Sequence, residues 1–148
     1  MKVLVINGPN LNFLGIREKS VYGDKTYDDL QIYLRKKAEE LEMEIEIYQS
    51  NGEGFIINKI QDAYFKKFDA IIINAGAYTH YSYAIRDAIS SVHIRTIEVH
   101  LSDIDNREPF RRVSVIRDVC EKAFYGKHFL SYGEALEYLN QYNNNVLL

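Results

Sequence analysis

Two uninterrupted runs of aliphatic and β-branched residues restrict the fold more than any other feature of this 148-residue chain. The runs are "VLVI", Val3 to Ile6, and "AIIIN", Ala70 to Asn74. A strand with one face in water alternates apolar and polar residues, so a continuous apolar run indicates a strand buried on both faces. Strands of that kind are typical of parallel sheets covered by helices on both sides. We therefore expect the two runs to be central strands of such a sheet.

Helical and strand patterns alternate along the rest of the chain. Thr26 and Asp29 form a capping-box pattern before a helix of about four turns, and Ser131 with Glu134 predicts the cap of a last helix. Further helices are expected around 56–68 and within 81–91, and further strands at 44–49, 93–101 and 119–125. Five strands alternating with helices predict an α/β, flavodoxin-like doubly wound five-stranded parallel sheet with helices on both faces. We expect one catalytic domain, residues 1–148.

Composition excludes several classes of function. The net charge of −3 and the absence of a basic block argue against a nucleic-acid or anionic membrane surface. No apolar stretch is long enough to span a bilayer, and "VLVI" is too short for the core of a signal peptide. The single cysteine, Cys120, allows neither an intrachain disulfide nor a cysteine metal cluster. We expect a cytoplasmic protein with a small-molecule substrate, no nucleic acid and no membrane.

Unusual polar residues follow three of the expected strands. In a doubly wound sheet, ligands bind beyond the carboxyl ends of the strands, where the strand order reverses. The residues expected at that edge are Asn10, Arg17 and Tyr22 in the long loop after the first strand, Asn74 and His80 after the third, and Glu98, His100 and Ser102 at the fourth. The sequence therefore predicts one site there.

The fourth strand carries the strongest signal. Glu98, His100 and Ser102 alternate with apolar residues, so the three polar side chains share one face of a strand that is otherwise buried. A buried carboxylate requires a partner, and an imidazole two residues along the strand is within reach. We expect Glu98 and His100 to form a pair.

Each candidate also has a purely structural interpretation. Asn10 could shape a turn, the histidines could be hydrogen-bonded structural residues, and Arg17 could be a solvated charge. Tyr22 is one of twelve tyrosines and could be a packed aromatic residue. Other chemistries lack their motifs: the loop after the first strand has no P-loop lysine, the strand ends carry Asn7 and Asn74 where a phosphoacceptor receiver needs acids, and no zinc spacing or nucleophile elbow is present.

Several separated motifs, taken together, resemble one family. They are "INGPNLNFLGIREKSVYG", "QSNGEG", "INAGAYTHYSYAIRDAI" and "IEVHLSDIDNREPFR", in that order. They are similar to the motifs of type II 3-dehydroquinate dehydratase (type II 3-dehydroquinase). The match runs from about residue 3 to residue 112 and weakens beyond Arg112. Lys19 and Gln61 depart from the family pattern, which commonly has Pro and His there.

The resemblance implies dehydration of 3-dehydroquinate to 3-dehydroshikimate, a shikimate-pathway step toward chorismate and the aromatic amino acids, with no metal and no other cofactor. It implies that Tyr22, as tyrosinate, is the general base that forms an enolate, and that Arg17 favours the tyrosinate. It implies that Asn10 helps to hold a water at the enolate oxygen and that His100, oriented by Glu98, is the general acid. The substrate contacts that it implies are Asn74, His80, Leu101, Ser102 and Arg111, with Leu101 and Ser102 acting through backbone amides and Asp87 reaching a neighbouring subunit's site. The implied assembly is a homo-oligomer, commonly a dodecamer of trimers.

Elementary electrostatics supports this division of roles. A free phenol with a pKa of about 10 is ionised to only about one part in a thousand at pH 7, so a tyrosine base needs a nearby cation. Arginine can supply that charge without losing its own proton. We also expect Gly8, Gly15 and Gly23 to flank a lid that brings Arg17 and Tyr22 over the substrate. Two other functions stay open: a noncatalytic small-carboxylate binding module, and a related hydro-lyase acting on another ring hydroxy acid.

Overall fold

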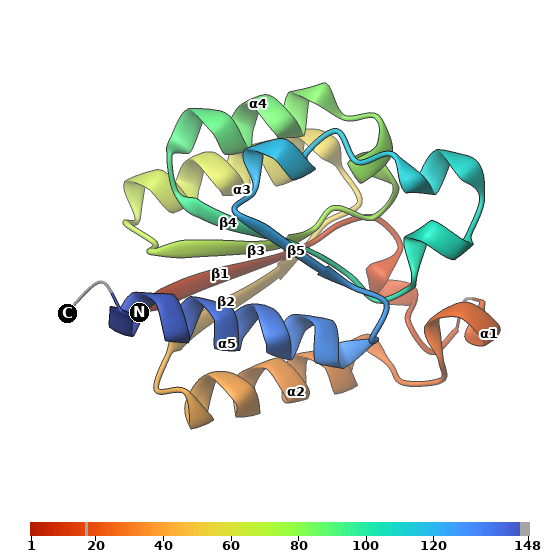
Figure 1. The fold of residues 1–148 in the computed structure, drawn as a ribbon, viewed down its shortest axis with the longest axis horizontal. Coiled ribbons are helices and arrows are strands. Elements are labelled where there is room, and N and C mark those ends of the chain that lie inside the picture. Colours follow the sequence, from red (N-terminus) through yellow and green to blue (C-terminus); the bar gives the residue numbers. More distant parts are fainter. Residues whose placement is uncertain (17, 146–148) are drawn as a thin grey trace.

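The computed structural model describes residues 1–16 and 18–145, and these form one sheet of five parallel strands in the order β2-β1-β3-β4-β5 (Figure 1). The strands are β1 (Lys2–Asn7), β2 (Glu44–Gln49), β3 (Ala70–Asn74), β4 (Arg95–His100) and β5 (Lys122–Tyr125). The two continuous apolar runs are β1 and β3, which pair side by side. The predicted flavodoxin-like architecture is confirmed.

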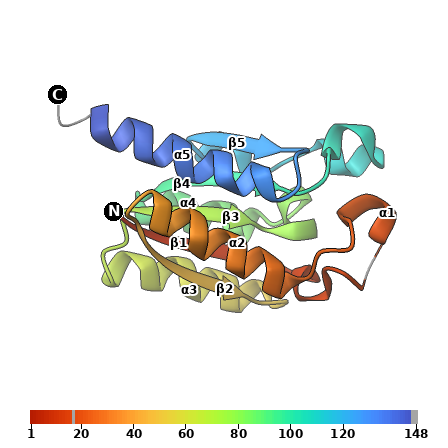
Figure 2. The ribbon, with the colours of Figure 1, turned by 90° about the horizontal axis from the view of Figure 1, so that it is seen from below.

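Helices cover both faces of the sheet (Figures 1 and 2). They are α1 (Lys19–Tyr22), α2 (Tyr27–Glu40), α3 (Glu53–Phe65), α4 (Tyr83–Val92) and α5 (Phe129–Asn145), with short 3₁₀ segments η1 (Leu11–Phe13), η2 (Gly76–His80), η3 (Ile104–Asn106), η4 (Pro109–Arg112) and η5 (Arg117–Val119). Helices α2 and α5 lie on one face, and α3 and α4 lie on the other. Among the described residues, no helix is long and apolar enough to cross a membrane.

Each central strand contributes to two hydrophobic cores because its side chains alternate between the faces. Val3 and Val5 pack in the core with residues of α2 and α5, whereas Leu4 and Ile6 pack in the core with residues of α3 and α4. All four side chains are completely buried. The absence of polar residues in this run is therefore a direct consequence of burial on both sides.

Local signals placed several element boundaries correctly. The capping box at α2 is present: Thr26 Oγ1 accepts from the Asp29 N–H at 3.1 Å, and Asp29 Oδ2 accepts from the Thr26 N–H at 2.9 Å. The alternating strand β2 is an edge strand, as its pattern predicts.

Other boundaries differ from the expectation. The predicted cap at Ser131 is wrong, because α5 begins at Phe129 and Ser131 lies inside its first turn. The Ser131 hydroxyl accepts instead from the N–H of Lys127, which precedes the helix, at 3.0 Å. Helix α3 ends at Phe65, so Phe68 is buried beyond the helix. Strands β4 and β5 begin later than expected, since His93 takes a left-handed conformation that ends α4, and η5 occupies residues 117–119.

The loops after β1 and β3 meet at the carboxyl edge of the sheet. The Gly8 N–H donates to the Asn74 carbonyl at 2.7 Å, and a Cβ on Gly8 would lie 2.5 Å from the Ala75 carbonyl oxygen. Only glycine permits this approach. Gly8 is therefore a fixed packing point rather than a lid hinge, and the predicted lid would extend only between Gly15 and Gly23, which both have positive φ.

Candidate active site

A cavity of about 110 Å³ opens at the carboxyl ends of the central strands. Its described lining residues are Pro9, Asn10, Leu11, Tyr22, Asn74, Gly76, Ala77, His80, His100, Leu101, Ser102, Ile104, Arg107 and Arg111. This is the position at which doubly wound sheets bind ligands. The volume suits a small metabolite rather than a nucleotide or a polymer.

The cavity brings most of the predicted site residues together. The predicted residues in its lining are Asn10, Tyr22, Asn74, His80, His100, Leu101, Ser102 and Arg111. Glu98 lies behind His100 and does not itself line the cavity. Asp87 is exposed on α4, away from this lining. Arg17 lies outside the described residues.

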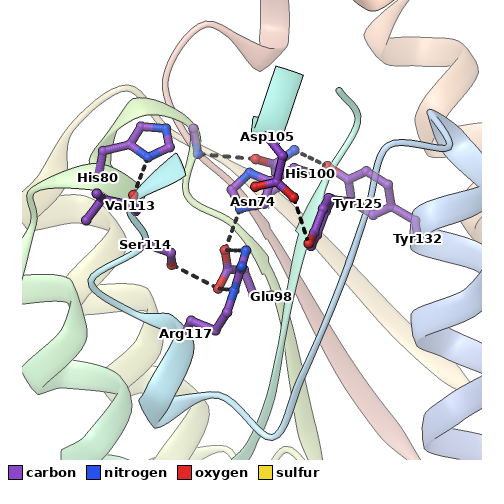
Figure 3. Close-up of polar contacts among 11 residues, drawn as sticks. Asn74, His80, Glu98, His100, Asp105, Val113, Ser114, Arg117, Tyr125 and Tyr132 are labelled. Carbon is purple, nitrogen blue, oxygen red and sulfur yellow. Dashed lines mark hydrogen bonds and ion pairs between the residues drawn. The ribbon is translucent and has the colours of Figure 1, made fainter. Parts of the chain in front are cut away.

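Glu98 and His100 form the expected pair (Figure 3). Glu98 Oε2 lies 2.6 Å from His100 Nε2, and both side chains are buried. An ionised carboxylate only accepts hydrogen bonds, so Nε2 carries a proton in this contact. Nδ1 is then the His100 atom that can exchange a proton with a ligand.

Glu98 has two further partners. Its Oε1 accepts from the Ser114 hydroxyl at 3.0 Å, and its Oε2 accepts from Arg117 Nη2 at 3.1 Å. Burial alone would raise the pKa of the Glu98 carboxyl, but hydrogen bonds from His100 and Arg117 outweigh burial and lower the pKa below its ordinary value. Glu98 is thus a stable buried anion at neutral pH.

His80 is held as a neutral ring. Its Nδ1 lies 2.7 Å from the Val113 carbonyl oxygen, which can only accept, so Nδ1 carries the proton. Burial lowers the pKa of the imidazole, and the proximity of His100 and Arg111 lowers it further. Nε2 of His80 is therefore a hydrogen-bond acceptor, suited to a ligand hydroxyl.

Tyr22 has a charged partner that sequence reasoning missed. Arg107 Nη1 donates to the Tyr22 hydroxyl oxygen at 2.6 Å, and the Arg107 guanidinium carbon lies 5.1 Å from the centre of the Tyr22 ring. The Arg107 side chain is only 11% exposed and is also paired with Glu18. The available sequence signal was its place in "DNREPFR", after the fourth strand.

A chain of buried polar groups fixes Asn74. Asn74 Nδ2 donates to the Tyr132 hydroxyl at 3.0 Å, and that hydroxyl donates to Asn7 Oδ1 at 2.6 Å. Asn74 Oδ1 accepts from the Gly76 N–H at 3.2 Å. Burial raises the pKa of the Tyr132 phenol, so it remains neutral and able to donate. Tyr132 is thus a positioning residue that its isolated sequence context did not reveal.

Two arginines lie in the cavity lining although the chain is acidic overall. They are Arg107 and Arg111, and their carboxylate partners Glu18 and Glu108 are on exposed positions outside the lining. A guanidinium is suited to binding a small carboxylate. Within residues 1–16 and 18–145, no group of three His, Cys, Asp or Glu side chains is arranged to hold a metal ion.

A comparison with known proteins gives a match over most of the chain. The family model described as "Dehydroquinase class II" matches residues 1–140. The chain belongs to the class II dehydroquinase family. The match extends past Arg112 to residue 140. Dehydroquinases are hydro-lyases of the shikimate pathway, so the chain is a lyase of that pathway.

Individual relatives cover nearly the whole chain. A protein named 3-dehydroquinate dehydratase from Caldicellulosiruptor bescii is 59% identical over 140 residues, which are 95% of this chain and 97% of that protein. The crystal structure of a type II dehydroquinase from Butyrivibrio crossotus has a TM-score of 0.93 at 55% identity, covering 95% of this chain and 97% of that one. A second, from Propionibacterium acnes, has a TM-score of 0.91 at 36% identity, covering 95% and 96%. The fold is therefore that of the family.

The buried chain through Tyr132 predicts a stability effect. Tyr132→Phe removes one hydroxyl and leaves Asn7 Oδ1 and Asn74 Nδ2 without that partner, so we expect a loss of about 1 to 3 kcal/mol in the free energy of unfolding. Urea unfolding at matched protein concentration measures the loss. The control is Tyr142→Phe, an exposed residue of the same helix. Equal stability of the two variants would contradict the role given to the Tyr132 hydroxyl.

Proposed function

We propose that this class II dehydroquinase converts 3-dehydroquinate to 3-dehydroshikimate by using Tyr22 as the base and His100 as the acid. The observation that carries the proposal is that each proton-transfer group at the cavity has its own charged partner. Arg107 contacts the Tyr22 hydroxyl, and Glu98 contacts His100. Elimination of a hydroxyl next to an acidic C–H needs one base and one acid.

The base acts first in the proposed reaction. Tyr22, as tyrosinate, removes a proton from the carbon beside the ketone, and the C–H electron pair passes to the carbonyl oxygen to give an enolate. Arg107 holds the Tyr22 hydroxyl by a hydrogen bond, and Arg17 is the positive charge that favours the tyrosinate. Asn10 helps to hold a water at the enolate oxygen, where charge develops.

The acid completes the elimination. The enolate re-forms the ketone, a C=C bond forms and the C–O bond of the leaving hydroxyl breaks. His100 donates a proton from Nδ1 to that oxygen, which leaves as water. Glu98 accepts from Nε2 throughout, so it stabilises the protonated ring and holds its orientation. Tyr22 returns its proton to solvent, and His100 takes one up.

The remaining lining residues bind the substrate. The backbone amides of Leu101 and Ser102, with the Arg111 guanidinium, face the substrate carboxylate. Asn74 and the neutral Nε2 of His80 contact its hydroxyls. The described lining contains no lysine, so a Schiff-base route has no candidate among those residues. The side chains supply the chemistry, and the proposal needs neither a metal nor another cofactor.

The proposal includes an assembly. Large apolar side chains are exposed on α3 and α4, among them Phe55, Phe65 and Tyr83, and Phe65 is 77% exposed. An exposed apolar face of this kind favours contact with another subunit. Asp87 lies on α4 close to this face, consistent with its reaching a neighbour's site in a dodecamer of trimers. We place this single catalytic domain in the cytoplasm.

A noncatalytic binding module is the weaker alternative. Recognition of a small carboxylate needs cations and amides, but it does not need a tyrosine bonded to arginine beside a histidine bonded to a buried carboxylate. The same argument does not separate 3-dehydroquinate from another ring hydroxy acid. A panel of such acids, tested for turnover, distinguishes these substrates.

The proton-transfer roles predict two catalytic losses. Tyr22→Phe and His100→Ala should each lower kcat at least about 100-fold while substrate binding is retained, because each removes one proton-transfer group. Turnover is followed by the ultraviolet absorbance of the conjugated product, and binding by calorimetry. Near-normal turnover in Tyr22→Phe would exclude it as the base.

The contact between Arg107 and Tyr22 predicts a catalytic loss. Arg107→Met removes the donor that holds the Tyr22 hydroxyl in place at the cavity, so we expect kcat to fall about 10- to 100-fold. Steady-state kinetics measures this loss. Arg112→Met is the matched control, because Arg112 donates to the Asp105 carbonyl and does not line the cavity. An unchanged kcat in Arg107→Met would remove Arg107 from the mechanism.

A further inference from the structure

The inference concerns Arg117, which lies outside the cavity lining and has no part in the steps above. It belongs to η5, in the stretch between the fourth and fifth strands. Its guanidinium contacts Glu98, with Nη2 at 3.1 Å from Oε2 and Nε at 3.4 Å from Oε1 (Figure 3). Both carboxylate oxygens are thus engaged by one planar group.

Arg117 is itself held in place. Its guanidinium carbon lies 5.0 Å from the centre of the Tyr125 ring, and the Tyr125 hydroxyl donates to Asp105 Oδ2 at 3.2 Å. The arginine therefore lies between the Glu98 carboxylate on one side and an oriented aromatic ring on the other. This packing restricts the rotamers of Arg117 and orients its guanidinium toward Glu98.

Among the described groups near Glu98, Arg117 is the one that stays positively charged throughout the proposed reaction. Burial raises the pKa of the Cys120 thiol to about 12, with the nearby Glu98 charge acting in the same direction, so this thiol stays neutral. His80 is neutral because its pKa is lowered. Ser114 donates a hydrogen bond but carries no charge. His100 gives and takes a proton during the proposed reaction, whereas arginine stays charged throughout.

We propose that Arg117 is a positioning residue for the reaction, which keeps Glu98 ionised and turned toward His100 through each change in the charge of that imidazole. This rests on the proposed function of His100. Without Arg117, the buried carboxylate would have Ser114 and His100 as its hydrogen-bond partners, and it would take up a proton more readily whenever His100 is neutral. A protonated Glu98 no longer stabilises the imidazolium.

The test is Arg117→Met, which removes the charge while keeping an apolar side chain of comparable length. Activity needs ionised Glu98, which is present above the pKa of that carboxyl and lost as pH falls through it. Removing Arg117 raises that pKa, so activity should be lost at a higher pH on the acid side of the profile. For Arg117→Met we expect a kcat at pH 7 about tenfold lower than that of the wild-type protein and a KM within about threefold of it. Arg117→Lys should partly restore both kcat and the pH profile.

Arg86→Met is the matched control for loosening of the same stretch. Arg86 Nη1 donates to the Val115 carbonyl at 2.9 Å and pairs with Asp118, but Arg86 does not contact Glu98. Arg86→Met should lower thermal stability without moving the acid side of the pH profile of kcat. If Arg117→Met leaves that side unmoved, or if Arg86→Met moves it equally, the positioning role is overturned.

A second readout does not depend on the reaction. A crystal structure of Arg117→Met should show the Glu98 carboxylate rotated or its contact with His100 lengthened beyond the 2.6 Å seen here. Absence of turnover in the wild-type protein would defeat the proposed function, and the crystal structure would then decide the role of Arg117 alone. An unchanged pair of Glu98 and His100 in that structure would contradict the inference.

Discussion

The site depends on a single buried negative charge. Glu98 has no exposed surface, and a carboxylate in that position is costly unless every oxygen has a partner. His100, Ser114 and Arg117 supply those partners from the same strand and from the stretch that follows it. The hydrogen bonds to Glu98 therefore fix the ring orientation of His100 and also hold residues 114–117 against the end of β4. A structural requirement and a catalytic one are met by the same contacts.

The sheet explains why these groups meet. In a parallel sheet the carboxyl ends of β1, β3 and β4 lie along one edge, so residues separated by most of the chain become neighbours there. Gly8 lets the first two loops touch, and Tyr132 of α5 links Asn7 to Asn74 beneath them. At this edge the proposed base and the proposed acid have partners of opposite charge. Arg107 contacts the Tyr22 hydroxyl, and Glu98 contacts His100.

The parts of this arrangement that depend on local sequence were predictable. Continuous apolar runs predicted β1 and β3, and the capping-box pattern of Thr26 and Asp29 predicted the start of α2. The alternation in β4 predicted the contact between Glu98 and His100. Contacts fixed by tertiary packing were not. Arg107 meets Tyr22 across 85 residues, and Tyr132 meets Asn74 across 58. The Ser131 cap failed for a related reason, because that hydroxyl serves the Lys127 N–H within a helix that starts earlier. Single arginines and tyrosines carry no pattern from which such pairings can be read.

The central claim is that side chains alone perform an elimination in this cavity. Its most direct test is the ultraviolet absorbance of purified protein that has been treated with a metal chelator and then mixed with 3-dehydroquinate. The account predicts a rise in absorbance from the conjugated product, at a rate equal to that of untreated protein. No rise from folded protein, or a rise that is abolished by the chelator and restored by added metal, would contradict it.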